Sequence, residues 1–293
     1  MARRLEGAQI AEAIKRELAE EVARLKKRNV TPGLAAVLVG DNPASVVYVE
    51  NKIKACDSIG IHSETHRYPA TVSEGELLDR IGGLNRSTKI HGILLQLPLP
   101  DQISADRLVA AVSAEKDVDG LHPVNRGLLH AGRATLAPCT PLGVLELLGR
   151  YQIPVAGRHV VILGRSQLVG IPLALLLLQK SNKGNATVTV CHSQSERLPE
   201  IARQADIVIA AIGRPQFVTA DMIKPGAVVV DVGINRVEDL SSPRGYRLVG
   251  DVNFDEVQQV ASAITPVPGG VGPMTIAMLL YNTITAAKNI SRQ

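Results

Sequence analysis

Three residues with reactive side chains recur at a spacing of four near the start of the chain: Tyr48, Lys52 and Cys56. On a helix this spacing places them on one face, beside the apolar Val49. The lysine then has two interpretations: a long side chain whose methylenes cover a helix edge, or a partly desolvated amine. Because burial disfavours the charged form, an amine of the second kind can exchange protons near neutral pH. The phenol one turn away could share a hydrogen bond with it or with a substrate.

Polar groups later in the chain are candidates for the same site. Gln96 interrupts the apolar run Gly92–Leu97, and an amide left unsatisfied there costs ~1–3 kcal/mol. It is either a satisfied core amide or a group that points from the end of a strand toward Lys52 or a ligand. Asp117 and Asp119 precede a glycine. They fit an Asx-type turn, a weak metal site, or a carboxylate that faces an aminopyrimidine-like ring.

A glycine turn in the second half is a candidate phosphate loop. The apolar strand Val160–Leu163 meets Gly164, and Gly170 opens an apolar helix. This arrangement places backbone N–H groups beside a phosphate, although the middle glycine of GxGxxG is missing and an ordinary turn fits as well. Arg165 lies in the turn, and Ser193 follows the next strand without an acidic neighbour. A cation and a hydroxyl in place of a carboxylate favour NADP over NAD.

Near the end of the chain, Pro266–Pro273 holds three prolines and three glycines in eight residues. Such a segment resists both helix and strand, and its backbone conformations suit close approach to a ligand. We therefore expect a loop that lies in a cleft between two domains, just before a last helix at Thr275–Asn289.

The elements that must position these residues alternate between strand and helix. Apolar runs such as Leu34–Gly40 and Thr187–Cys191 predict buried strands, and helical periodicity predicts helices at Ser45–Ile59 and Val169–Leu178. Ser45 is a possible N-cap of the first of these helices, and Gly60 its stop. This alternation predicts the α/β class, with parallel sheets covered on both faces. The polar, glycine- and proline-rich Asp117–Pro141 marks the junction between two α/β units.

Composition narrows the classes of protein. The 293 residues carry a net charge of +4 and include no Trp and two Phe, so a module that stacks nucleic-acid bases on aromatic rings is not expected. Three widely spaced cysteines suit a reducing cytosol and predict neither a disulfide framework nor a zinc site. Met1–Arg28 predicts an amphipathic helix rather than a signal peptide, and no apolar run is long enough to span a membrane. We expect a cytoplasmic protein.

At this point the residues converge on one family. The chain strongly resembles the bifunctional methylenetetrahydrofolate dehydrogenase/methenyltetrahydrofolate cyclohydrolases, in family order and over most of its length. The matching segments are Tyr48–Lys52, Gly92–Pro100, Asp117–Gly120, Pro138–Pro141, Gly164–Ser166 with Val169, Gly170 and Pro172, and the highly specific Pro266–Thr275.

The resemblance implies a fold and an activity. It implies a two-domain α/β protein with a cleft between the domains: a Rossmann-like NADP-binding domain at 138–274, and an α/β catalytic and folate-binding domain formed by 1–137 together with 275–293. It implies oxidation of 5,10-methylenetetrahydrofolate with NADP and hydrolysis of the methenyl product to 10-formyltetrahydrofolate. The expected partners are this small-molecule folate and a second copy of the chain, in the one-carbon metabolism that serves purine, histidine and methionine biosynthesis.

The resemblance also assigns roles to residues, with no metal. Lys52 is the key catalytic residue, Tyr48 positions the substrate, and Gln96 tunes the lysine. Asp119 binds the pterin ring, and Cys56 is near the site without a chemical role. The other implied substrate-binding residues are Leu97, Pro268, Gly269 and Gly270. The implied NADP-binding residues are Thr140, Gly164, Arg165, Ser166, Ser193 and Ile234.

Three alternatives remain from the residues. One is another NADP oxidoreductase on a two-domain α/β scaffold, such as a shikimate dehydrogenase-like enzyme, for which a Lys/Asp pair and no proline-glycine loop are expected. Another is a non-enzymatic dinucleotide sensor, in which Lys52 has no purpose. The third is a dehydrogenase that has lost the hydrolysis step. Oxidation of methylenetetrahydrofolate with NADP tests the first alternative. Replacement of Lys52 by Met should change nothing beyond stability in a sensor, whereas in a bifunctional enzyme it should abolish methenyl hydrolysis and leave NADP binding near normal.

Overall fold

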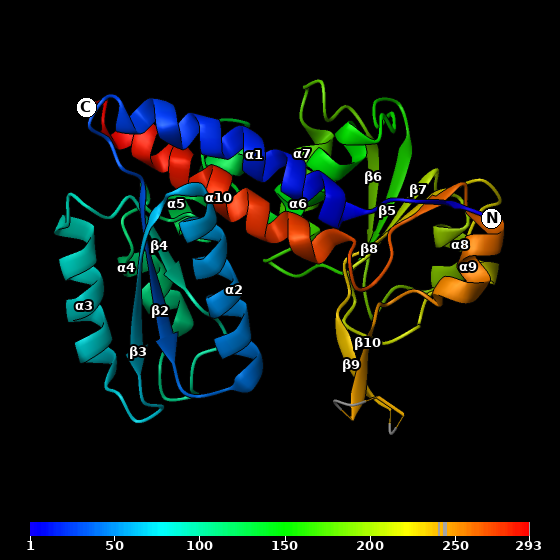
Figure 1. Ribbon diagram of the computed structural model, residues 1–293. Helices are drawn as coiled ribbons and strands as arrows, with labels where there is room; N and C mark the ends of the chain where they lie inside the picture. Colours follow the sequence, from blue (N-terminus) through cyan, green and yellow to red (C-terminus); the bar gives the residue numbers. More distant parts are fainter. Residues whose placement is uncertain (240, 243–244, 293) are drawn as a thin grey trace. The chain divides into compact units, whose positions relative to one another are not determined.

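The chain folds into two compact units, each built on its own parallel sheet (Figure 1). The computed structural model describes residues 1–239, 241–242 and 245–292. The six-stranded unit comprises Met1–Ala11 and Thr140–Thr275, and the three-stranded unit comprises Glu12–Cys139 and Ile276–Gln293. The expected α/β class is confirmed. The expected cleft concerns the placement of the two units relative to each other and stays a prediction.

A fully parallel sheet forms the centre of the six-stranded unit. Its strands, in their order across the sheet, are β1 (Arg3–Arg4), β11 (Ala263–Ile264), β8 (Val228–Asp231), β7 (Ile207–Ala210), β5 (His159–Leu163) and β6 (Thr187–Cys191). The chain passes from β5 to β6 on one side and then crosses to β7 on the other. Ligands of open parallel sheets bind at the carboxyl ends of the strands beside such a switch point.

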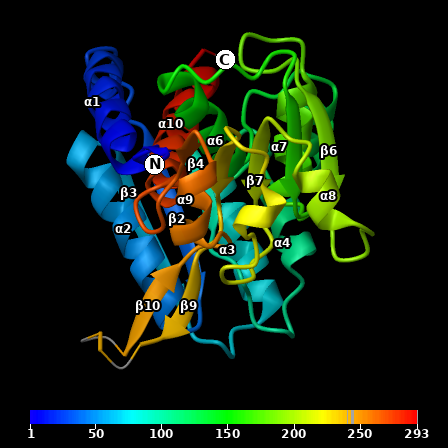
Figure 2. The same cartoon turned by 90° about the vertical axis from the view of Figure 1, so that its right-hand side faces the viewer.

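Helices cover both faces of this sheet. Figure 1 shows α6 (Cys139–Arg150) and α7 (Gly170–Leu178) on one side and α8 (Leu198–Ala202) and α9 (Phe254–Val260) on the other. The 3₁₀ helix η1 (Ala220–Met222) joins the second layer, where strand residues such as Val208 pack with Met222 and Val257. The antiparallel β9 (Asn235–Glu238) and β10 (Tyr246–Val249) form a separate arm, visible in Figures 1 and 2.

The three-stranded unit has a smaller sheet in the order β3 (His62–Tyr68), β2 (Gly33–Val39) and β4 (Gly92–Leu95). All seven residues of β2 are buried, because helices cover both faces of a central parallel strand. In Figure 1, α2 (Pro43–Ile59) lies on one face, and α3 (Glu74–Arg86) and α4 (Ala105–Ala111) lie on the other. The α3 and α4 side buries Val37, Ile81 and Leu108 in one apolar cluster.

Local signals explain where α2 begins and ends. The Asn42 side chain accepts hydrogen bonds from the amides of Ala44 (2.9 Å) and Ser45 (3.3 Å), and Pro43 occupies the first turn, where its missing N–H has no partner to lose. The prediction that Ser45 caps the helix was therefore wrong. The predicted stop is confirmed, since Gly60 takes the left-handed conformation at φ 80°.

Three other segments differ from the sequence predictions. Met1–Arg28 is not a single helix, because Arg3–Arg4 pairs with β11 before α1 (Gly7–Lys26) begins. Asp117–Pro141 contains the helix α5 (Pro123–His130). The proline-glycine segment is already helical at its end, where α10 (Val271–Ile290) begins, since proline is tolerated in a first turn. Among the described residues, no helix combines the length and the apolar character that crossing a bilayer requires.

Candidate active site

Lys52 is a buried amine in the middle of α2, with 8% of its surface exposed. Its Nζ donates a hydrogen bond of 3.1 Å to Oε1 of Gln96. Val49 and Cys56, three and four residues away on the same face, are fully buried. Lys52 is therefore a buried amine and not a side chain that covers an exposed helix edge.

Gln96 is held in place by the sheet. Its backbone amide, directly after β4, donates to the Val37 carbonyl of β2 at 2.9 Å. Its side-chain Nε2 donates to the Leu97 carbonyl at 2.7 Å, so Oε1 is the atom that faces Lys52. The Gln96 side chain is half-buried, and both of its polar atoms have partners. It points from the carboxyl end of its strand toward the lysine.

The two nearby aspartates have different surroundings. Asp117 is buried, and its carboxylate accepts hydrogen bonds from the amides of Leu121 (3.1 Å) and His122 (2.8 Å) and from the Asn125 side chain (2.8 Å). It forms the turn that precedes α5. The half-buried Asp119 is coupled electrostatically to Lys52. Burial raises the pKa of the Asp119 carboxyl, and the Lys52 charge opposes this rise.

Asn282 of α10 also belongs to this region, although sequence reasoning did not single it out. Its Nδ2 donates to the carbonyls of Val118 (2.7 Å) and Ala137 (2.9 Å), and Sγ of Cys139 lies 3.8 Å from Oδ1 of Asp119. Asn282 thus connects the residue before Asp119 to the segment that precedes α6. Its own Oδ1 is buried and has no hydrogen-bond partner among the described residues. The available sequence signal was weak, an amide in a largely apolar helix that also contains threonines, Lys288 and Asn289.

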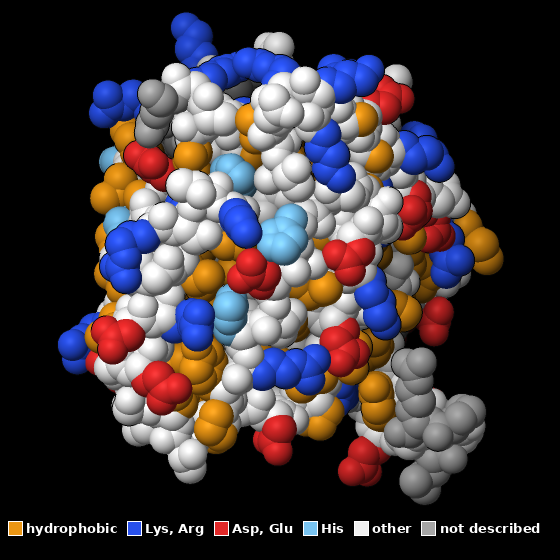
Figure 3. Space-filling view, turned by 60° about the vertical axis from the view of Figure 1, so that its left-hand side comes forward, with side chains coloured by type: hydrophobic (Ala, Val, Ile, Leu, Met, Phe, Trp, Pro, Cys, Tyr) orange, Lys and Arg blue, Asp and Glu red, His pale blue; other side chains and the backbone are white. Residues whose placement is uncertain are grey.

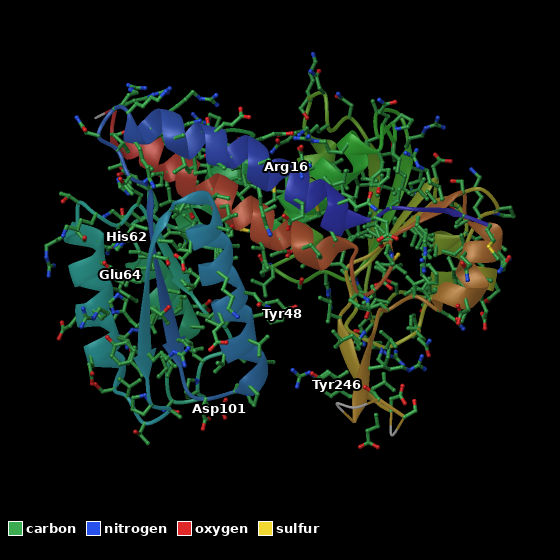
Figure 4. All side chains as sticks on the ribbon, viewed as in Figure 1. Arg16, Tyr48, His62, Glu64, Asp101 and Tyr246 are labelled. Atoms are coloured by element: carbon green, nitrogen blue, oxygen red, sulfur yellow. The ribbon has the colours of Figure 1, made fainter. Side chains whose placement is uncertain are left out.

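Tyr48 and Cys56 differ sharply, although they flank Lys52 on one helix. Tyr48 is 41% exposed, and Figure 4 shows it on α2. Cys56 is fully buried, which raises the pKa of its thiol to about 12, with the neighbouring Asp57 charge contributing. The thiol stays protonated and is a poor nucleophile. The helix therefore offers an accessible phenol, a buried amine and an inert thiol.

The glycine turn lies at the switch point of the larger sheet. Gly164 directly follows β5 and has φ +122°, a conformation that side chains disfavour. A Cβ on Gly164 would overlap the carbonyl oxygen of Ala211, which follows β7, and a Cβ on Gly170 would overlap the carbonyl of Gly164. Both positions therefore require glycine. The turn brings bare backbone to the N-terminus of α7, where a phosphate can bind.

Other predicted NADP residues follow neighbouring strands at the same edge. They are Arg165 and Ser166 after β5, Ser193 after β6 and Ile234 after β8, and all four are exposed. The sheet register aligns Leu163 with Cys191 and Ala210, so these strand ends lie side by side. Ser166 Oγ accepts a hydrogen bond of 3.1 Å from the Val169 amide, which connects the turn to α7.

Thr140 and the proline-glycine loop have contacts of their own within the six-stranded unit. The Thr140 hydroxyl, at the start of α6, lies 3.1 Å from that of Thr275. The Gly269 carbonyl accepts a hydrogen bond of 2.9 Å from Ala8, and a Cβ on Gly7 would overlap the carbonyl of Gly270. The loop therefore packs against the start of α1. The roles of Thr140 with NADP, and of Pro268, Gly269 and Gly270 with substrate, stay predictions.

Fold and site together define a class of protein, a dinucleotide-binding α/β enzyme with a buried lysine in its three-stranded unit. Residues 5–119 match the tetrahydrofolate dehydrogenase/cyclohydrolase catalytic domain, and residues 138–291 match the NAD(P)-binding domain of the same proteins. The chain therefore belongs to the tetrahydrofolate dehydrogenase/cyclohydrolase family.

Individual relatives match over nearly their whole length. The bifunctional protein FolD of Dehalococcoides mccartyi (strain CBDB1) is 55% identical over 286 residues, which are 97% of this chain and 96% of that protein. The FolD dehydrogenase/cyclohydrolase structure from Campylobacter jejuni has a TM-score of 0.93 at 47% identity, with 99% of this chain and 100% of that chain covered. The Trypanosoma brucei FolD structure, complexed with NADP and an inhibitor, has a TM-score of 0.94 at 42% identity and covers 100% and 99%. These matches confirm the predicted family and set aside the shikimate dehydrogenase-like alternative.

Proposed function

We propose that the chain catalyses two consecutive reactions of one-carbon metabolism. In the first, 5,10-methylenetetrahydrofolate loses a hydride to NADP and becomes the 5,10-methenyl cation. In the second, water adds to that cation, the ring opens to 10-formyltetrahydrofolate, and one proton is released. The observation that carries the proposal is the buried Lys52–Gln96 pair, found in a chain that belongs to this family.

The glycine turn fits the dinucleotide, because Gly164 and Gly170 let the turn after β5 pack closely against the Ala211 carbonyl and the start of α7, where backbone N–H groups can bind a phosphate. Bound NADP supplies the hydride acceptor. Gly164 and Ser166 hold its phosphates, Arg165 and Ser193 its 2′-phosphate, and Ile234 and Thr140 complete the site. These assignments rest on the exposed positions of the edge residues and on the resemblance.

Lys52 performs the proton transfers of the hydrolysis. Its amine takes a proton from the attacking water and returns one to the ring nitrogen that leaves. In either protonation state Nζ keeps a hydrogen for Gln96 Oε1, so the amide fixes the direction of the amine through both steps. The hydride step needs no proton transfer by a side chain, because orientation of the reacting carbon is its main requirement.

Side chains around Lys52 orient the folate. The Asp119 carboxyl accepts hydrogen bonds from the ring nitrogen and amino group of the pterin, a role consistent with its half-buried position and its coupling to Lys52. Tyr48 and Leu97 border the same site, and Pro268, Gly269 and Gly270 approach the substrate from the proline-glycine loop. Substrate chemistry is assigned to residues 1–137 with 275–293, and NADP binding to 138–274. Met1–Ala11 nevertheless packs with the six-stranded unit.

The enzyme is a cytoplasmic homodimer. The strand β3 supports a second copy, since it pairs only with β2 among the described strands and so leaves one edge open to another chain. His62 and Glu64, 3.0 Å apart, lie along it (Figure 4), and Figure 3 shows histidine and acidic side chains together on this face. Three free, buried cysteines suit a reducing compartment. Light scattering should give twice the chain mass.

The test of function uses the purified full chain. With 5,10-methylenetetrahydrofolate, NADPH should appear with NADP and only slowly with NAD. Separately supplied 5,10-methenyltetrahydrofolate should be hydrolysed faster with the protein than in buffer alone. This hydrolysis should need no added dinucleotide. Absence of the first activity contradicts the dehydrogenase assignment, and absence of the second favours a dehydrogenase that has lost hydrolysis.

A further inference from the structure

Two aspartates that the reaction does not use are fully enclosed in the six-stranded unit. Asp231, the last residue of β8, is 3% exposed, and Asp251, which follows β10 after Gly250, is 0% exposed. They stand at the beginning and the end of the excursion that the chain makes through the β9–β10 arm. Ile234, an expected NADP residue, lies inside that excursion. A buried carboxyl needs donors, because burial of an unsatisfied polar group is costly.

Asp231 ties the two ends of the arm together. Its Oδ1 accepts hydrogen bonds from the amides of Gly233 (2.9 Å) and Asp251 (3.0 Å), and its Oδ2 accepts one from Val252 (2.9 Å). Gly233 lies on the outgoing chain, and Asp251 and Val252 lie on the returning chain. One side chain thus fixes the separation of the two segments at the root of the arm.

Asp251 extends this connection to the neighbouring strand end. Its Oδ2 accepts hydrogen bonds from the amides of Ile212 (2.6 Å) and Gly213 (2.9 Å), and its Oδ1 accepts one from Nδ2 of Asn235 (2.9 Å). Ile212 and Gly213 form the turn after β7, whereas Asn235 directly follows Ile234. The carboxylate therefore holds two separate pieces of the edge that carries the glycine turn.

The packing around the pair leaves no room for a side chain at two neighbouring glycines, Gly233 and Gly250. A Cβ on Gly233 would overlap the Asp251 carboxyl, and a Cβ on Gly250 would overlap the Asp231 carboxyl. Every partner of the two carboxylates named above is an N–H group that donates to a carboxylate oxygen. An asparagine at position 251 would have to turn its own NH₂ group toward N–H groups on one side, so one of the two pieces would lose its acceptor.

We propose that Asp251, supported by Asp231, is the positioning residue that holds the Gly213 turn and Ile234 in the arrangement that binds NADP. This inference rests on the proposed cofactor site and names the residues that shape it. The pair does not touch the reacting atoms and acts through the backbone of the two loops. Its loss should weaken dinucleotide binding and leave methenyl hydrolysis, which needs no dinucleotide, intact.

The test compares Asp251→Asn with Asn235→Ala, which removes only one arm of the network and is the milder change. Calorimetry should show NADP binding weakened at least tenfold in Asp251→Asn and about threefold in Asn235→Ala, with methenyl hydrolysis within twofold of wild type. Hydrogen exchange should become faster at the amides of Ile212 and Gly213 in Asp251→Asn. The matched control is Asp206→Asn. Asp206 directly precedes β7, at the amino ends of the strands, and its carboxylate accepts hydrogen bonds from Lys224 and from the His159 amide. This variant should bind NADP as wild type does.

Two results would overturn the proposal. The first is wild-type NADP affinity together with unchanged exchange at Ile212 and Gly213 in Asp251→Asn. The second covers the case in which that variant fails to fold: Asn235→Ala then decides, and wild-type NADP affinity in a normally folded Asn235→Ala protein contradicts a positioning role. A wild-type chain that binds no NADP would instead contradict the proposed function itself.

Discussion

The two sheets bring function to their carboxyl ends by different means. At the larger sheet, bare glycine backbone and exposed loop residues form the edge, and buried carboxylates hold the loops in place. At the smaller sheet, a long side chain from α2 meets an amide that follows β4. The first arrangement suits a ligand recognised by its phosphates, and the second suits proton transfer. Changes of backbone freedom should therefore damage the first site, and changes of a single functional group should damage the second.

Removal of the amine should have the largest effect. Lys52→Met is expected to reduce methenyl hydrolysis about 10³-fold, within the range that general acid–base groups contribute. NADP affinity should stay within about twofold by calorimetry, because Lys52 belongs to the three-stranded unit. During oxidation of the methylene substrate by this variant, the methenyl intermediate should accumulate, and its absorption should rise. Unchanged hydrolysis would refute the role of the lysine.

The reverse effect is expected at the glycine turn. Gly164→Ala places a Cβ against the Ala211 carbonyl at φ +122°, so NADP affinity should fall about 10- to 100-fold and stability by ~1–3 kcal/mol. Hydrolysis of supplied methenyltetrahydrofolate should continue. Gly149→Ala in α6 is the control, since its Cβ would meet only a lysine carbon at 3.9 Å. Equal loss of both activities in Gly164→Ala would break the separation between the two sites.

A moderate effect is expected at Asn282, since its loss removes the Nδ2 donor from the Val118 and Ala137 carbonyls and leaves the Val118 carbonyl with the weaker Cys139 thiol donor at 3.4 Å. Asn282→Leu should raise the KM for folate about tenfold and lower stability by ~1–3 kcal/mol. Thr283→Val is the matched control, because among the described residues the Thr283 hydroxyl bonds only to the Leu279 carbonyl of its own helix. The control should lose stability without a change in KM. If both variants shift KM alike, the effect belongs to helix packing.

A further effect, without direct loss of either activity, is expected on stability as a function of pH. Burial raises the pKa of Asp231 to about 7, and the Asp251 charge adds to the rise while backbone N–H donors oppose it. Between pH about 4 and about 7 the folded chain therefore keeps a proton that the unfolded chain has released. The free energy of unfolding should fall as pH rises through this range, by about 3 kcal/mol at most.

Urea unfolding at pH 5 and pH 8 measures this slope, and Asp231→Asn should flatten it. Asp206 provides a contrast of opposite sign, since its hydrogen bond with Lys224 lowers the pKa of its carboxyl. Its stabilising contribution should be lost only as pH falls below about 4. An unchanged slope in Asp231→Asn would assign the pH dependence to other groups.

Local patterns predicted much of the fold. The strand Thr187–Cys191 has its predicted limits, and the predicted helix stop at Gly60 is confirmed by its left-handed conformation. The short helix α5 was missed because its eight residues lie in a polar segment with little periodicity. The cap of α2 was misplaced because Asn42 and Ser45 are both good capping residues and only the structure distinguishes them.

The functional residues also divide into those that a local pattern reveals and those that it does not. Lys52 and Gln96 were identified from helical spacing and from a polar interruption of an apolar run, and both are local signals. Asn282 was missed because it bonds to a carbonyl 164 positions away, a contact that no periodicity records. Asp231 and Asp251 were missed for a related reason, since their partners come from three loops. Recognition of a functional residue from sequence works best where the residue interrupts a local pattern.

The pairing of β1 with β11 has a consequence for synthesis of the chain. Arg3 and Arg4 are made before every other strand of the larger sheet, but their partners, Ala263 and Ile264, are made about 260 residues later. Until then the N-terminal segment has no strand to join, and the larger sheet lacks its last neighbour. Completion of this sheet therefore waits until Ala263 and Ile264 have been made, when the three-stranded unit still lacks Ile276–Gln293.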